Sequence, residues 1–485
     1  MWDTGSNPVR NLIMCGAAAA AVLAGCAVGP TYHRPETPVD AQFANAGEPG
    51  LGQGESVERY WERFADPLLN GLIDDALAHN KALGVAAANL QAARAARRLA
   101  GFDLFPTVTL AGGYSHVLES AQQLPGVDRR DREFDNAQGG FDGLWELDLF
   151  GRVRRNVEAA RGDLAASAAT LRDARVSVIA EVARDYFILL GLQDQLALTL
   201  RNADNQERTA KLTHTRLEAG RGNELDTSRA EAQWQTTLAS VPTLQASIAT
   251  TTYRLSVLTG RQPTALGERL SLQAPPNLPV LNAVGTPEEL LRHRPDVRVA
   301  ERRLAAATAR VGVAMGDLFP KVTMIGEVGY SAPAFGDFGT SEVRFFSVGP
   351  SISWAAFDLG RVQARIKSAK AQTDAALAAY EGAVLNALED TEGALITYGR
   401  SQTRREALRV AAAASDKAAD LAQKRFEGGL IDFLEVLDAE RTALSAELLL
   451  SQSRTDSATS LIAVYKALGA GWTVSESNTA VNTQR

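Results

Sequence analysis

Two long segments of the chain carry apolar residues at the spacing of a coiled-coil seam. Successive apolar positions are seven or four residues apart, which is the a/d pattern of helices packed along their length. The positions are Leu171, Val178, Val182, Leu189 and Leu196 in the first half, and Leu377, Val384, Leu388 and Leu395 in the second. The pattern therefore predicts long helices in both halves of the chain.

The placement of proline indicates how long these helices are. No proline lies between Pro125 and Pro242, and none follows Pro350. Because a proline inside a helix costs about 3 kcal/mol, such stretches favour uninterrupted helix. A helix over 152–219 would be about 100 Å long at a rise of ~1.5 Å per residue.

Glycine-rich breaks then turn each long helix back into a second one. They lie at Gly220–Asn223 and at Gly428–Gly429. We therefore expect two long α-hairpins, over 152–259 and 361–469. A helical pattern of this length is typical of a rod or a tube and not of a compact globule.

Four shorter segments alternate between apolar and polar residues, as strands do. Each has about ten residues, the length of a strand in an outer-membrane barrel, although a soluble β-sandwich shows the same alternation. The segments are 107–116, 141–150, 321–330 and 345–354. Trp145 and Trp354 within them favour the aromatic belts of a membrane interface.

Several markers occur twice in the same order, which predicts a duplicated unit of about 210 residues. The two copies of each marker lie 209 or 214 residues apart. The pairs are Asp103–Pro106 with Asp317–Pro320, Asp148–Arg152 with Asp358–Arg361, and Arg216–Gly220 with Arg425–Gly429.

The N-terminal segment predicts export and attachment to a membrane surface. Residues 12–25 form an apolar run that follows Arg10 and ends at Cys26. The run is shorter than the ~20 residues of a spanning helix but has the length of a signal-peptide core. Leu23–Cys26 resembles the lipobox of bacterial lipoproteins, in which the cysteine receives diacylglycerol and an acyl chain. An ordinary secretory signal is the alternative. We expect Cys26 to carry a lipid that anchors the protein to a membrane surface.

These observations divide the chain into six parts. They are a signal peptide (1–25), a lipidated extended segment (26–65), a first repeat (66–262), a linker (263–285), a second repeat (286–471) and a disordered tail (472–485).

The composition and the motifs argue against several classes of function. The chain has 50 basic and 57 acidic residues and a net charge of -7, which argues against nucleic-acid binding. Its two cysteines, Cys15 and Cys26, lie in the leader, and its five histidines show no metal-ligand spacing. No hydrolase or nucleotide-binding motif is present. We expect no enzyme activity, no metal and no cofactor apart from the covalent lipid.

Four strands cannot close a barrel. Unpaired backbone groups at open sheet edges cost several kcal/mol each in lipid. The chain must therefore share its barrel with copies of itself. A dimer would supply eight strands and a trimer twelve, and the pattern alone does not choose between them.

Three strings resemble the TolC-like family of bacterial outer-membrane efflux proteins, in its lipoprotein branch of OprM/NodT type. They are Cys26–Pro35, Trp61–Leu69 and Leu291–Val297. The resemblance implies a mainly α homotrimer with a 12-stranded transmembrane β-barrel continuous with a 12-helix α-barrel. It also implies a passive duct for drugs or toxic compounds, extending from the bacterial outer membrane into the periplasm. A periplasmic adaptor (membrane fusion protein) and an inner-membrane RND pump would be the partners.

Other classes fit the sequence less well. A periplasmic adaptor lipoprotein would have one helical hairpin and no set of amphipathic strands. A lipoprotein hydrolase would need a nucleophile with a base beside it, which the sequence does not offer.

The resemblance also implies a gate at the periplasmic tip. Glu435 and Asp438 match the acidic constriction rings of the family. Being three residues apart, they share one helical face, so that three copies would form stacked carboxylate rings that favour cations. Asp226 matches a position that accepts locking bonds from the second hairpin.

The usual donors of that lock, a Tyr and an Arg, correspond to Phe426 and Ile431 in this chain. Neither side chain can donate, so Arg425, Arg221 or Arg229 must be considered instead.

The most specific string of the resemblance contains Arg292, Arg294, Pro295 and Asp296. We expect these residues to organise a turn and the start of a helix near the equator of the tunnel. Pro295 would lie at or just before the first helical turn.

Overall fold

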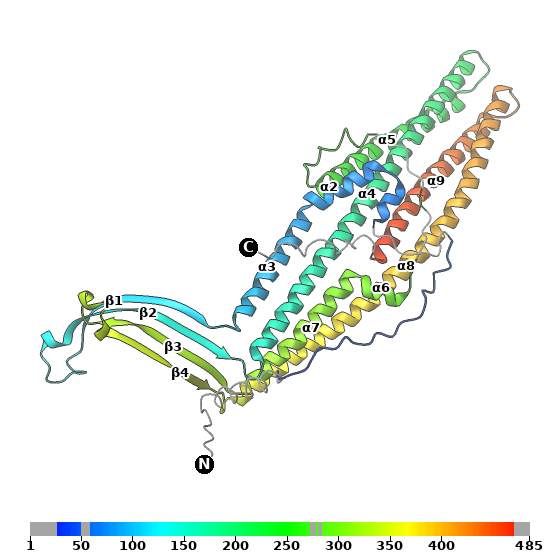
Figure 1. Ribbon diagram of the computed structural model, residues 1–485. Coiled ribbons are helices and arrows are strands. Elements are labelled where there is room, and N and C mark those ends of the chain that lie inside the picture. Colours follow the sequence, from blue (N-terminus) through cyan, green and yellow to red (C-terminus); the bar gives the residue numbers. More distant parts are fainter. Residues whose placement is uncertain (1–26, 50–58, 272–277, 280–283, 470–485) are drawn as a thin grey trace. The chain divides into compact units, whose positions relative to one another are not determined.

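The computed structural model describes residues 27–49, 59–271, 278–279 and 284–469 (Figure 1). Cys26, the expected signal peptide and the expected tail lie outside these residues, as do 50–58 and parts of the linker. Within them the predicted fold class is confirmed, because two long α-hairpins and four β-strands account for most of the chain.

The long hairpins lie where the coiled-coil pattern predicts them. The first consists of α4 (Arg152–Glu218) and α5 (Glu224–Leu258), and the second of α8 (Leu359–Glu427) and α9 (Phe433–Ala467). Pro242 lies inside α5.

Shorter helices come before the strands of each repeat. They are α2 (Pro67–His79) and α3 (Lys81–Phe102) in the first repeat, and α6 (Pro287–His293) and α7 (Pro295–Gly316) in the second. Short 3-10 turns lie at Tyr60–Phe64, Arg129–Arg132, Phe335–Asp337 and Ser341–Val343. In the described part of the chain, no helix combines the length and the apolar character needed to cross a membrane.

The four strands form one antiparallel sheet in the order β1-β2-β3-β4 (Figure 1). They are β1 (Thr107–Leu118), β2 (Glu133–Leu147), β3 (Lys321–Ala332) and β4 (Arg344–Ser353). The first and last strands, β1 and β4, are the two edges of the sheet.

The second strand differs from its predicted range of 141–150. It begins eight residues earlier and ends at Leu147, because Asp148 has another role. The two carboxylate oxygens of Asp148 accept the backbone N–H groups of Val153 (2.9 Å) and Arg154 (2.8 Å). Asp148 thereby satisfies free donors in the first turn of α4, and the chain leaves the sheet before it.

One face of the sheet is mainly apolar and the other mainly polar, although the exposed Leu144 and Ile325 lie on the second face. The strand register aligns rows of each kind. Leu110 pairs with Phe141, Phe141 with Val328, and Val328 with Phe346, and all four are exposed. The next row joins Thr109, Asp142, Glu327 and Ser347. An exposed apolar row suits contact with lipid, and a polar row suits contact with water.

The two tryptophans of the sheet make equivalent contacts in the two repeats. The Trp145 indole N–H donates to the Leu104 carbonyl, and that of Trp354 donates to the Leu318 carbonyl, both at 3.0 Å. Both carbonyls belong to the duplicated Asp-Leu-Phe-Pro turn that enters each strand pair. The duplication is therefore preserved at the level of single hydrogen bonds.

Close contacts divide the chain into two compact units, each with segments from both repeats. Among the described residues, the first unit comprises those within 1–36, 89–168 and 299–381, and the second comprises those within 37–88, 169–298 and 382–485. The domain boundaries predicted from the duplication divide the sequence in a different way, and they remain a prediction.

The larger apolar core lies in the second unit, and it contains Trp61, Phe64 and Leu69 of the Trp61–Leu69 string together with the preceding Tyr60. Tyr60 stacks on Tyr465 of α9, with ring centroids 4.3 Å apart. Asp66 caps α2 through the backbone N–H groups of Leu68 and Leu69, and it accepts a 2.6 Å hydrogen bond from the Tyr186 hydroxyl of α4. The Trp61–Leu69 string therefore holds α2 against the long helices.

Candidate functional site

The turns that join the two helices of each long hairpin have the same backbone geometry. Gly220 and Gly429 both adopt left-handed φ angles, of 69° and 71°. The next residue in each turn closes a wide backbone hydrogen bond, from Arg221 to the Arg216 carbonyl (2.8 Å) and from Leu430 to the Arg425 carbonyl (2.9 Å). This is the Schellman end of a helix, in which glycine adopts the left-handed conformation without steric cost.

A small apolar cluster packs the two hairpins together near these turns. It contains buried residues of all four long helices: Ala210, Ala230, Phe426, Phe433, Val436 and Leu437. The rings of Phe426 and Phe433 lie 5.6 Å apart. The cluster holds the start of α9 in place and so determines which of its side chains face outward.

Arg216 of α4 joins the first hairpin to the second. Its guanidinium donates to the carbonyls of Phe426 (3.0 Å) and Glu427 (3.3 Å), the last residues of α8. It also lies 4.2 Å from the centre of the Phe426 ring. A cation at a helix C-terminus and over an aromatic ring is favourable in both positions.

Sequence reasoning considered Arg425, Arg221 and Arg229 as donors and missed Arg216. The signal was present, since Arg216 opens the duplicated marker and is the counterpart of Arg425. The resemblance implies a donor to the Asp226 side chain, whereas the acceptors of Arg216 are main-chain carbonyls.

Asp226 lies in the turn of the first hairpin and is bonded locally. Its carboxylate accepts from the Asn223 side-chain amide, and its backbone N–H donates to the Asn223 side-chain oxygen, both at 2.8 Å. Asn223 thus caps α5. Within the described part of the chain, Asp226 has no hydrogen bond to the second hairpin.

Glu435 and Asp438 lie in the first two turns of α9 and are exposed. Phe433, Val436 and Leu437 of the same turns are buried in the apolar cluster, so the acids occupy the opposite side of the helix. Neither carboxylate forms an ion pair with any residue that the structure describes. Both charges are therefore available to ions in the surrounding water.

The Arg292–Asp296 segment lies elsewhere in the second unit and forms the junction of α6 and α7. Pro295 is the first residue of α7, as the sequence predicts. Arg292 is exposed and pairs with Glu288 of its own helix. Arg294, by contrast, is only 7% exposed.

Arg294 donates hydrogen bonds to acceptors of three helices, α7, α8 and α9. It forms two bonds to Asp296, of 3.0 and 2.6 Å, and one to Asp390 of α8 at 3.0 Å. It also donates to the Ala387 carbonyl at 3.4 Å and to the Ala467 carbonyl at 2.9 Å. Because Ala467 ends α9, the cation neutralises the negative end of that helix.

Two acids of this cluster have pKa values that are shifted in opposite directions. Burial opposes ionisation of Asp296, but the bonds from Arg294 outweigh it and hold its pKa below the ordinary value. Asp173 of α4 has a raised pKa, because it is buried and because the charge of Asp296 is near. Arg294 thus keeps Asp296 charged, whereas for Asp173 the favourable charges of Arg294 and Lys466 do not offset the effect of burial on its pKa.

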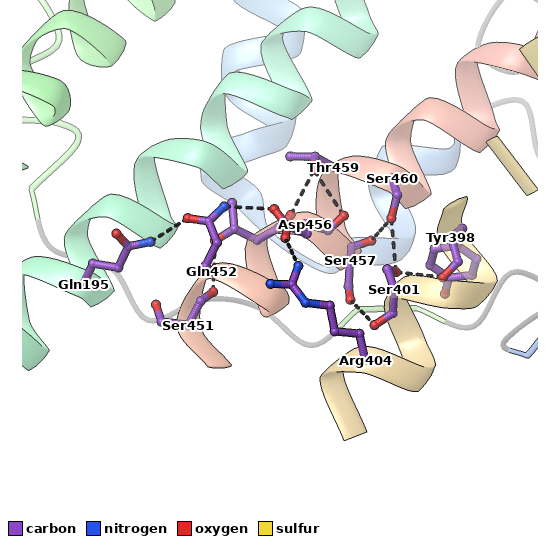
Figure 2. A network of polar contacts seen from close by, with 11 residues as sticks. Gln195, Tyr398, Ser401, Arg404, Ser451, Gln452, Asp456, Ser457, Thr459 and Ser460 are labelled. Atoms are coloured by element: carbon purple, nitrogen blue, oxygen red, sulfur yellow. Dashed lines mark hydrogen bonds and ion pairs between the residues drawn. The ribbon is translucent and has the colours of Figure 1, made fainter. Parts of the chain in front are cut away.

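Polar contacts continue along α9, which lies between α4 and α8 (Figure 2). Gln195 of α4 donates to Gln452 of α9 at 3.0 Å, and Arg404 of α8 pairs with Asp456 of α9 at 3.0 Å. The two hairpins of the chain are therefore joined to each other well away from their turns.

In the parts of the chain that the structure describes, no three His, Cys, Asp or Glu residues are grouped so that they could hold a metal ion.

Comparison with known proteins identifies the class. The profile of the family described as outer membrane efflux protein matches residues 72–261 and 286–470. Nodulation protein T of Rhizobium leguminosarum bv. trifolii is 30% identical over 93% of this chain and 96% of its own length. Outer membrane protein OprJ of Pseudomonas aeruginosa is 31% identical over 93% and 94%.

A solved structure agrees with these matches. The outer-membrane channel OprN has 42% identity and a TM-score of 0.86, over 92% of this chain and all of that one. The chain belongs to the outer membrane efflux protein family.

This confirms the resemblance, the function and the localisation expected from the sequence. The chain is an outer-membrane channel of an efflux system and extends into the periplasm. Its family is one of channels and not of enzymes.

Proposed function

We propose that three copies of the chain form one passive duct. The observation that supports this most strongly is the four-stranded sheet, which has two open edges, one mainly apolar face and one mainly polar face. Edges β1 and β4 can pair only with other chains, and three copies would give twelve strands. The polar row of Asp142 and Glu327 would face the water-filled interior.

The duct would be closed at the hairpin turns by residues from both hairpins. Glu435 and Asp438 would supply the two carboxylate rings, since both are exposed and neither has an ion-pair partner among the residues that the structure describes. Asp226 would contribute from the facing turn. Arg216, which binds the end of α8, would hold the two hairpins of each chain together in the closed state.

The duct would work with a periplasmic adaptor and an inner-membrane RND pump, which supplies the energy. Relatives of the chain carry names such as solvent efflux pump outer membrane protein and antibiotic efflux pump outer membrane protein. Drugs or toxic small molecules are therefore the proposed cargo.

The proposal includes a lipid anchor on Cys26 and no enzyme activity, metal or cofactor. Arg292, Arg294, Pro295 and Asp296 are proposed to maintain the α6–α7 junction and not to touch cargo. This fits the burial of Arg294, whose guanidinium donors are taken up by Asp296, Asp390 and two main-chain carbonyls.

The assembly can be tested on the protein purified from outer membranes in a mild detergent. A trimer that resists SDS until it is boiled, and that conducts ions in a planar bilayer, is the expected result. A monomer recovered with the inner membrane and without conductance would contradict the proposal and favour an adaptor.

A further inference from the structure

The second unit contains a cavity of about 640 Å³ that the gate and the ion cluster around Arg294 do not use. It lies between α4, α8 and α9, beside Leu278 of the inter-repeat segment. Its volume is in the range of pockets that bind small organic ligands. Phe187, Leu190 and Ala458, all buried, give it an apolar floor.

Three arginines and two acids line the same cavity. Arg409 is bonded twice to Glu406, at 2.7 and 3.0 Å, so these two charges neutralise each other. Asp194 accepts a 2.6 Å hydrogen bond from the Ser451 hydroxyl. Arg405 and Arg454 are different, because neither has a hydrogen bond or ion pair to any residue in the described part of the chain.

The guanidinium groups of Arg405 and Arg454, which have no hydrogen-bond or ion-pair partner in the described part of the chain, line the cavity together with the apolar floor and define the chemistry of a ligand. Guanidinium donates in a planar fork that matches the two oxygens of a carboxylate, or those of a sulfonate or phosphate. The apolar floor would cover a hydrocarbon body of the same ligand. The opposite charge distribution, with acids above the floor, would favour cationic compounds.

We propose that this cavity binds a small amphiphilic anion, with its charged group at Arg405 and Arg454 and its apolar part against Phe187 and Leu190. The site differs in charge preference from the proposed gate, where the exposed acids attract cations. It also differs in place, because its walls are the bodies of the long helices and not their turns.

The cavity belongs to a single chain. Apart from Leu278, its wall residues come from α4, α9 and α8. Asp194 of α4 contacts Ser451 of α9, and Arg404 of α8 pairs with Asp456 of α9, a pair that Figure 2 shows. Because α9 lies between the other two helices, the cavity opens between neighbours within one chain. A bound ligand would therefore contact both hairpins at once.

The test uses two aromatic probes of equal size. The anion 2-naphthoate and the neutral alcohol 2-naphthylmethanol are titrated into the purified full-length protein in lipid nanodiscs, with empty nanodiscs as background. Saturation-transfer NMR measures binding. We expect 2-naphthoate to bind more tightly than the alcohol, and its affinity to fall with added salt.

The double variant Arg405→Gln/Arg454→Gln should weaken naphthoate binding at least tenfold and leave the alcohol unchanged. Leu450→Trp, which fills the cavity without changing its charge, should weaken both probes. Arg98→Gln, at an exposed arginine of α3 outside the cavity, is the matched control and should change neither. If the double variant does not assemble, Leu450→Trp and the salt dependence still decide.

Three results would overturn the inference. The first is equal binding of the two probes, and the second is naphthoate binding that survives both cavity variants. The third is no probe binding at all, together with adaptor binding that depends on Arg405 and Arg454. That last result would make the cavity a protein-docking surface.

Discussion

The ion cluster around Arg294 and the acidic side of α9 contain charged groups in opposite environments. Arg294 is 7% exposed and has four acceptor groups, from its own turn, from α8 and from the end of α9. Glu435 and Asp438 are exposed and have no ion-pair partner in the described chain. Removing one partner of a buried and fully paired charge destabilises the fold, whereas an exposed and unpaired charge can act on passing ions.

Removing the buried cation should have the largest effect on stability. Arg294→Leu leaves Asp296 and Asp390 without their counter-ion and the Ala467 carbonyl without its donor. We expect a loss of about 2–4 kcal/mol, seen as a lower temperature of unfolding. Arg292→Leu is the control from the same string. Its exposed pair with Glu288 should contribute less than about 1 kcal/mol.

The same cluster should depend on pH in a defined direction. Asp296 has a depressed pKa, so its contribution is present above the ordinary aspartate pKa and is lost as the pH falls through the folded-state value. Asp173 has a raised pKa, so its ionisation opposes folding, and this cost disappears on acidification. Asp296→Asn should therefore flatten the acid loss of stability, and Asp173→Asn should not destabilise at neutral pH. The opposite pattern would contradict the assignment of Arg294 to Asp296.

Loss of the contact between the hairpins should have an intermediate effect. Arg216→Ala removes the bonds to the Phe426 and Glu427 carbonyls and the contact with the Phe426 ring, together worth about 1–2 kcal/mol. We expect a less firmly closed tip and a higher single-channel conductance in planar bilayers. Arg221→Ala, in the adjacent turn, should leave the conductance unchanged. If Arg216→Ala and Arg221→Ala have the same conductance, Arg216 is not part of the contact that keeps the tip closed.

The smallest change in stability, with the clearest change in function, is expected at the acidic side of α9. Glu435→Gln/Asp438→Asn alters two exposed groups and should change stability by less than about 0.5 kcal/mol. The cation preference, measured as a reversal potential across a salt gradient, should fall markedly. Glu224→Gln, an exposed acid at the start of α5, is the control. An unchanged reversal potential would show that the acids do not line the aperture.

The sequence predicted the elements well and the contacts of the candidate site only in part. Heptad spacing and glycine breaks located both hairpins, since these patterns report directly on local backbone geometry. They could not show that Asp148 leaves the second strand to cap α4, because an aspartate fits the polar position of a strand equally well. Nor could they show that Arg216 donates to main-chain carbonyls, which have no residue-specific signature.

By itself, the sequence determined the duplication, the long helices, the strands and the placement of Pro295 at the start of α7. The duplication is visible in the sequence itself. The helices, the strands and the turn at Pro295 depend on interactions between residues close together in the chain, so periodicity and turn chemistry are sufficient to reveal them. The tertiary structure decided which arginine joins the hairpins, which carboxylates Arg294 pairs with and where the cavity between α4, α8 and α9 forms. The Arg216–Phe426, Arg294–Asp390 and Asp194–Ser451 contacts join residues that are 210, 96 and 257 positions apart, and only the packing of the helices brings them together.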